Sequence, residues 1–121
     1  MSSSSTSPQQ HVFQLPALLA TQGTPRWERL RDGVEISRLY DRGPDGPSAA
    51  LLRYAPGASV PAHRHEGLEH IFVLEGEQED QRGRYPAGSF VVNLPGSVHE
   101  VKSPRGCVVL VLWERPVTFV A

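Results

Sequence analysis

The sequence contains a single cysteine, Cys107, so it cannot form an internal disulfide bond. It has no Cys-x-x-C pair, and this sparse use of cysteine fits a reducing compartment. With 121 residues the chain can still bury a hydrophobic core without disulfide bonds, and its length corresponds to one domain.

An excess of charge and long apolar runs are also missing. Twelve Lys and Arg residues stand against 13 Asp and Glu residues, so no basic surface for nucleic acid is expected. The longest unbroken apolar run, Cys107–Trp113, is too short to cross a membrane. No Lys or Arg precedes Arg26, and Gln14 and Pro16 interrupt the weakly apolar N-terminal stretch, so a signal peptide is not expected there. We expect a cytoplasmic protein that binds neither nucleic acid nor membrane.

Glycine and proline are abundant, with 11 of each between short apolar runs, which is typical of an all-β sandwich or barrel with many turns. Residues 1–24 begin Ser-rich and are predicted to be a partly disordered tail, with one short helical turn at residues 16–20. Residues 25–121 are predicted to form one β-barrel domain. Its predicted strands are residues 34–40, 49–54, 58–65, 69–75, 90–93, 98–101, 107–113 and 118–120.

The predicted strand 69–75 is apolar on both faces. Glu69, Ile71, Val73 and Glu75 share one face, His70, Phe72 and Leu74 share the other, and a polar turn region begins at Gly76. The strand 107–113 is apolar on both faces as well. Both faces are therefore expected to be covered, by another sheet edge or by a second subunit, and we expect a homodimer.

A cluster of polar residues interrupts this apolar pattern. His63 and His65 lie two residues apart on one strand, so their side chains share a face. Glu69 has the same parity as Ile71 and Val73, and a carboxylate on an apolar inner face is costly unless it meets a cation. His99 reaches them from a different strand. Three imidazoles and one carboxylate suit a divalent transition metal and leave positions open for water or a substrate.

The plain alternative is a set of unrelated surface residues. A His-x-His pair alone is often an exposed strand face, and a single Glu is usually solvated. The order and spacing of the four residues favour a site.

Two stretches around these residues match a known motif. Gly57, His63, His65, Glu69 and Gly76 match the first half of the cupin pattern, and Gly88, Gly96 and His99 match the second half. Leu94 and Ser103 stand where the pattern has Pro and Asn, which are turn and packing positions. Residues 25–115 as a whole resemble the cupin-like domain of ChrR-type anti-sigma factors.

This resemblance implies a small jelly-roll β-barrel with little helix, and one divalent metal on His63, His65, Glu69 and His99. Zinc or iron is favoured, and manganese and nickel also accept the set. The resemblance implies a zinc-holding sensor module, while similar cupins include non-haem iron dioxygenases that cleave small diketones or aromatic ketones. The separate helical domain with zinc-binding cysteines that such anti-sigma factors carry has no counterpart here, so anti-sigma activity is not inferred.

Three functions from different classes remain open: a metal-binding sensor or binding module with a small-molecule ligand, an iron dioxygenase, and a metal-free dimeric scaffold. No acid or base outside the four residues stands out, so no catalytic residue is assigned. Candidate pocket walls are Ile71, Val73, Phe90, Val92 and Val101.

His70 is expected to be structural or interfacial, His11 inert, and Cys107 a buried small residue. Trp27 and Trp113 are expected to be core or interface residues. The candidates for the pocket rim are Arg53, Tyr54, Arg64 and Tyr85, although an outward, solvated side chain is the favoured alternative for Arg53.

Overall fold

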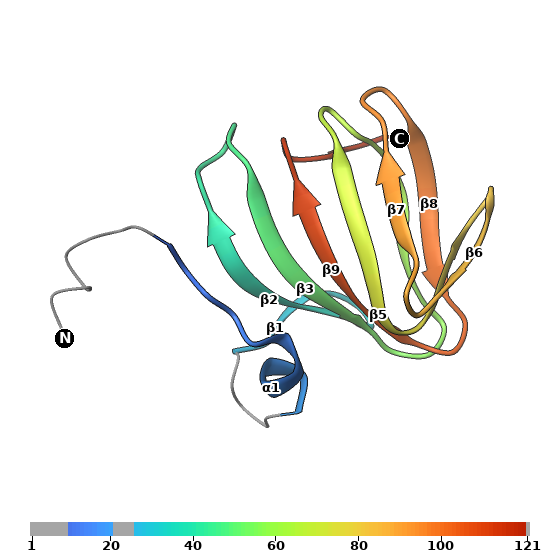
Figure 1. The fold of residues 1–121 in the computed structure, drawn as a ribbon. Helices are drawn as coiled ribbons and strands as arrows, with labels where there is room; N and C mark the ends of the chain where they lie inside the picture. Colours follow the sequence, from blue (N-terminus) through green and yellow to red (C-terminus); the bar gives the residue numbers. More distant parts are fainter. Residues whose placement is uncertain (1–9, 21–25, 121) are drawn as a thin grey trace, which may run out of the picture.

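The computed structural model describes residues 10–20 and 26–120. Within these residues the chain forms one short helix and ten strands (Figure 1). In chain order they are α1 Leu15–Ala20, β1 Glu28–Arg31, β2 Val34–Asp41, β3 Ser48–Tyr54, β4 Ala58–Arg64, β5 Glu69–Asp80, β6 Gly83–Pro86, β7 Phe90–Asn93, β8 Val98–Ser103, β9 Cys107–Trp113 and β10 Thr118–Phe119. The predicted all-β class with little helix is confirmed. No described helix is long and apolar enough to span a membrane.

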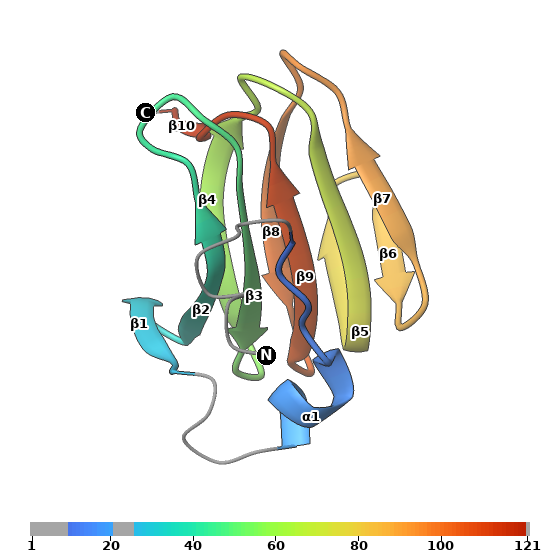
Figure 2. The ribbon, with the colours of Figure 1, turned by 60° about the vertical axis from the view of Figure 1, so that its left-hand side comes forward.

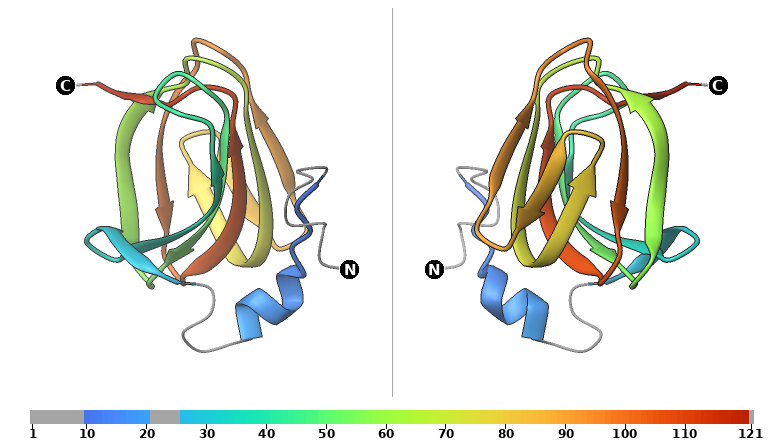
Figure 3. Two further views of the ribbon diagram at one scale, coloured as in Figure 1. Left: turned by 90° about the vertical axis from the view of Figure 1, so that its left-hand side faces the viewer. Right: turned by 90° about the vertical axis from the view of Figure 1, so that its right-hand side faces the viewer.

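The strands pair antiparallel in the order β1-β2-β3-β9-β5-β8-β4-β10, and β6 and β7 both pair with β5. The twelve-residue strand β5 holds the two sides of the sheet together, because its first half pairs with β7 and β9 and its second half with β6 and β8. The sheet therefore curls into a barrel, which the two side views show (Figure 3). This is the cupin-like jelly roll that the resemblance implies.

Alternate residues of the strands point into the barrel and form its core. Val73 and Val109 are fully buried there, and Val111 is 1% exposed. The buried core cluster comprises Val34, Ile36, Ala50, Leu52, Tyr54, Val60, Ile71, Val73, Val101, Cys107, Val109 and Val111. The core thus follows the period-two pattern of the strands.

Strand β5 differs from its predicted form. It does not end in a turn at Gly76 but continues to Asp80. Its register against β9 shifts between Val73 and Glu75, which is the signature of a β-bulge. The bulge changes the parity of inward residues, so Glu75 is exposed whereas Gln78 is buried. The predicted placement of Glu75 on the inner face is therefore wrong.

Strand β7 also corrects a prediction. Glu69 pairs with Asn93 and Phe72 with Phe90, so the odd-numbered residues of β7 face inward. Phe90 is 63% exposed and Val92 is 44% exposed. Both side chains lie on the outer face and are not pocket walls. Ile71 and Val101 line a cavity inside the barrel, whereas Val73 is buried in the core without lining it.

The outer face of the sheet is covered unevenly. Leu51 of β3 points away from the core cluster and yet is fully buried. On this side of the sheet residues 10–14 run along β9, and α1 lies beyond the lower ends of the strands (Figure 2). Phe72 and Phe90 farther along the same face remain exposed. Most of the predicted tail, residues 1–9 and 21–24, lies outside the described residues, so the boundary at residue 25 stays a prediction.

Candidate metal centre

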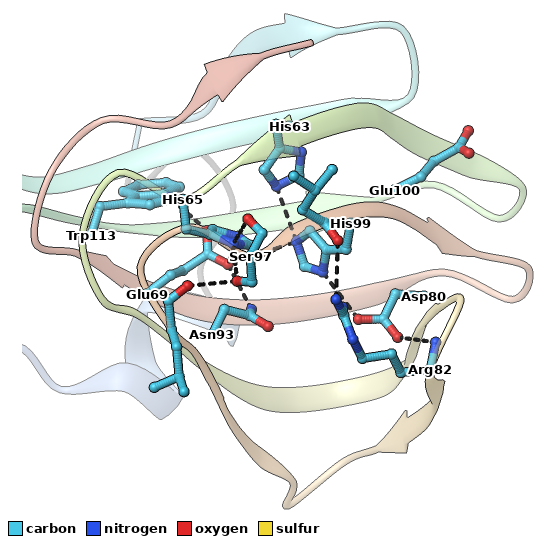
Figure 4. A network of polar contacts seen from close by, with 12 residues as sticks. His63, His65, Glu69, Asp80, Arg82, Asn93, Ser97, His99, Glu100 and Trp113 are labelled. Carbon is cyan, nitrogen blue, oxygen red and sulfur yellow. Dashed lines mark hydrogen bonds and ion pairs between the residues drawn. The ribbon is translucent and has the colours of Figure 1, made fainter.

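Four buried side chains from three strands and one loop meet inside the barrel (Figure 4). His63 belongs to β4, His65 follows it, Glu69 begins β5 and His99 belongs to β8. His63 and His99 are direct partners in the β4–β8 pairing. One potential ligand atom from each of the four residues lies within 4.8 Å of all the others. The four residues that the sequence singles out are therefore brought together by the fold.

The hydrogen bonds of the imidazole rings determine which nitrogen faces the centre. His63 Nδ1 lies 2.8 Å from the Pro61 carbonyl oxygen, and His65 Nδ1 lies 3.0 Å from that of Ser97. His99 Nδ1 lies 3.0 Å from Asp80 Oδ2. Because all three partners accept hydrogen bonds, each neutral ring carries its proton on Nδ1. The three Nε2 lone pairs then converge on one point.

This convergence is unfavourable without a cation. His63 Nε2 and His99 Nε2 are 3.0 Å apart, too close for two bare lone pairs. His65 Nε2 is the sole buried side-chain nitrogen or oxygen of the described residues that makes no hydrogen bond. It lies 3.0 Å from Glu69 Oε1 but without hydrogen-bond geometry. An unpaired buried nitrogen and a set of three imidazoles and one carboxylate fit a divalent transition metal.

The carboxylate of Glu69 is held from two sides. Asn93 Nδ2 donates to Oε1 at 2.9 Å, and Trp113 Nε1 donates to Oε2 at 2.7 Å. Burial acts to raise the pKa of Glu69, but His65, His99 and the Asn93 amide outweigh it and hold the pKa below its ordinary value. Glu69 is therefore ionised at neutral pH and oriented toward the histidines.

Burial also affects the histidines themselves. It lowers the pKa of His63 and of His99, because the charged imidazolium loses its hydration inside the barrel. Both rings are therefore neutral near pH 7. Neutral imidazole is the form that binds a metal ion.

A cavity of about 80 Å³ adjoins the four residues. Its lining is mostly apolar, with Tyr54 and Gln78 as polar groups on the barrel wall, and burial raises the pKa of Tyr54 so that its hydroxyl stays protonated. At the mouth, the Phe119 ring lies with its centroid 5.7 Å from that of His63. The site thus has room for a small molecule beside the cluster.

The remaining sequence candidates lie around the centre or away from it. His70 lies on the outer face and stacks on Phe90, with ring centroids 5.6 Å apart, as its parity predicts. Arg53 is not at the barrel mouth, because its guanidinium lies 4.1 Å from the Trp27 ring and pairs with Glu35. Arg64 forms an ion pair with Glu66, and the Tyr85 hydroxyl donates to Asp80. Tyr54 is a core residue and not a rim group, and Cys107 is buried at the start of β9.

Sequence reasoning missed four residues that contact the cluster, namely Asp80, Asn93, Ser97 and Trp113. Asn93 gave no clear signal, because the residues before it are apolar on both faces and only the pairing of β7 with β5 turns Asn93 inward. Asp80 gave none either, because its inward direction depends on the bulge in β5.

A family model described as the ChrR cupin-like domain matches residues 16–118. The chain belongs to this family. The anti-sigma-E factor ChrR of Cereibacter sphaeroides is 35% identical over 97 residues, which make up 78% of this chain but only 44% of that protein. This cupin therefore spans less than half the length of its curated relative.

Solved structures agree with the family. ChrR in complex with SigE from Rhodobacter sphaeroides matches with a TM-score of 0.65 and 32% identity, over 73% of this chain and 48% of that one. An acetylacetone dioxygenase from Acinetobacter johnsonii matches with a TM-score of 0.75 and 16% identity, over 93% of this chain and 82% of that one. The second likeness shows the fold alone.

Proposed function

We propose that this protein is a metal-binding module that holds one divalent transition metal, zinc or iron, on His63, His65, Glu69 and His99, and binds a small molecule beside it. The observation that carries the proposal is the convergence of three Nε2 atoms and one carboxylate in a buried centre, where each Nδ1 already has an acceptor. Membership in the ChrR cupin-like family supports a sensor or binding role.

Elemental analysis tests the metal. The protein is purified without added metal and without a nickel column, and its metal content is compared with that of the double variant His63→Ala/His99→Ala. His70→Ala is the matched control, because this histidine lies on the outer face. We expect about one metal per chain in the wild type and the control, and none in the double variant. Unchanged metal content in the double variant would contradict the proposal.

A dioxygenase acting on a small diketone or aromatic ketone is the second candidate. The mostly apolar cavity of about 80 Å³ beside the cluster favours it, because an apolar wall suits the carbon skeleton of such a ketone. Ferrous iron on His and carboxylate ligands supplies dioxygen chemistry when it is bound. Within the described residues, the chain's own contribution is to bind and orient the ketone between the cluster and the Tyr54–Gln78 side of the cavity.

Oxygen uptake separates these two candidates. Protein loaded with ferrous iron under anaerobic conditions is mixed with oxygen and a panel of β-diketones and aromatic ketones. Substrate-dependent uptake supports the dioxygenase. Tightly held zinc without uptake supports the sensor or binding module.

The homodimer also remains a proposal. Phe72, Phe90, Val92 and Leu94 are all more than a third exposed, and Phe72 and Phe90 are cross-strand partners on the outer face. A second copy packed on this face would remove their apolar surface from water. Sedimentation at micromolar concentration tests this, and a monomer there would contradict it. A metal-free dimeric scaffold requires that dimer together with absence of metal.

A further inference from the structure

The tip of the β5–β6 hairpin lies against the β8 strand at His99 (Figure 4). Asp80 ends β5 and its side chain is 4% exposed. Its Oδ2 lies 3.0 Å from His99 Nδ1, while its Oδ1 accepts from the Tyr85 hydroxyl and from the Arg82 amide, each at 2.8 Å. Both carboxylate oxygens are therefore occupied, which holds the Asp80 side chain in one orientation.

The charge of Asp80 is maintained inside the fold. Three hydrogen-bond donors surround its two oxygens, namely the Tyr85 hydroxyl, the Arg82 amide and His99 Nδ1, and such donors favour the charged carboxylate. His99 thus faces a carboxylate, whereas the Nδ1 atoms of His63 and His65 face neutral acceptors. A carboxylate partner strengthens an imidazole as a metal ligand.

The next residue of the hairpin holds the backbone on both sides of His99. The Gln81 side-chain amide donates to the Val98 carbonyl at 2.9 Å and accepts from the Glu100 amide at 3.3 Å. Strands β5 and β8 pair at a single position, Glu79 with Lys102, so no β5 backbone reaches this part of β8. The primary amide of Gln81 therefore takes the place that a neighbouring peptide group would have in a sheet.

We infer that Asp80 and Gln81 are positioning residues for the metal ligand His99, with Asp80 orienting its ring and Gln81 its backbone. This inference rests on the proposed metal site. His99 is the ligand that the chain must bring from 36 residues beyond His63, and the hairpin tip determines where its Nε2 lies. Neither residue touches the metal.

Metal affinity and spectroscopy test the inference. Zinc affinity is measured by competition with a chromophoric chelator, and the coordination environment by the visible spectrum of the Co²⁺-loaded protein. Asp80→Asn keeps the shape and an acceptor oxygen but removes the charge, and we expect it to weaken zinc affinity roughly 10- to 100-fold and to alter the Co²⁺ spectrum. Glu75→Gln, an exposed carboxylate of the same strand, is the control and should change neither.

Two milder variants protect the test against a failure of Asp80→Asn to fold. Tyr85→Phe removes one hydrogen bond to Asp80, and Gln81→Ala removes both contacts to the β8 backbone. Each should weaken zinc affinity severalfold while the circular dichroism spectrum stays unchanged. Wild-type zinc affinity in Asp80→Asn, Tyr85→Phe and Gln81→Ala would overturn the inference and leave the proposed function intact.

A measurement on the metal-free protein separates a failure of this inference from a failure of the proposed metal site. Long-range ¹H–¹⁵N spectra report the tautomer of His99, which should carry its proton on Nδ1 in the wild type and populate both tautomers in Asp80→Leu. A wild type that binds no metal would sink the proposed function, and an unchanged tautomer in Asp80→Leu would overturn the role of Asp80.

Discussion

The indole Nε1 of Trp113 donates a hydrogen bond of 2.7 Å to Glu69 Oε2. It links the end of β9 to the first residue of β5 and holds a carboxylate that faces three histidines. Trp113→Phe removes this donor and keeps most of the ring. We expect zinc affinity to fall about 10-fold, because the carboxylate loses its orientation. A competition titration measures this, with Trp27→Phe as the control, and equal affinities in the two variants would contradict it.

The stability of the metal-free protein should depend on pH through the buried histidines. Burial lowers the pKa of His63 and His99 from 6.5, so the unfolded chain binds more protons than the folded one once the pH falls below that value. The free energy of unfolding is therefore highest above pH 6.5, falls as the pH drops from 6.5 toward the lowered pKa values, and levels off below them. Glu69 and Asp80, whose pKa values are also lowered, add a further loss at more acidic pH.

Urea unfolding with chelator present, at about pH 7.5 and about pH 5.5, checks this dependence. The variant His63→Ala should lose less stability between the two pH values, because it has one buried histidine fewer to protonate. An unfolding midpoint in the wild type that stays constant across this range would refute the prediction.

Two motif glycines should differ in their tolerance of alanine. Gly76 has a φ of +74°, and a Cβ there would lie 2.1 Å from the Gly106 carbonyl oxygen. Gly57 has a φ of +85° but open space around it. Gly57→Ala should cost about 1–2 kcal/mol from backbone strain alone. Gly76→Ala should cost clearly more, since the β9 backbone must also move. Urea unfolding compares the two, and equal losses would show that the close approach does not matter.

Phe119 should control how fast a bound metal ion leaves the centre. Its ring lies beside His63 and lines the cavity, and β10 is attached to β4 through only two paired positions. Phe119→Ala opens this side of the cavity, so we expect zinc to be released to a chelator severalfold faster. Phe90→Ala removes an exposed ring from the outer face and serves as the control. A stopped-flow measurement in which both variants release zinc at the wild-type rate would count against a capping role.

Much of the centre could be predicted because side-chain direction on a regular strand follows a local rule. His63 and His65 share a face by their spacing, and Glu69 shares a face with Ile71 and Val73, as the structure shows. The same rule correctly placed His70 outside. It failed at Glu75 because a bulge intervenes, and at Phe90 and Val92 because the pairing of β7 with β5 sets their direction.

The sequence by itself determined the all-β class, eight of the ten strands and the identity of the four polar residues that meet, but not β1 and β6. Only the tertiary structure decided that Nε2 and not Nδ1 of each histidine faces the centre, and that Asp80, Asn93 and Trp113 hold the ligand set. The physical reason is distance along the chain. Alternation along a strand involves neighbouring residues, whereas a hydrogen bond such as that between Trp113 and Glu69 joins residues 44 positions apart and exists only when the curled sheet brings β5 and β9 together.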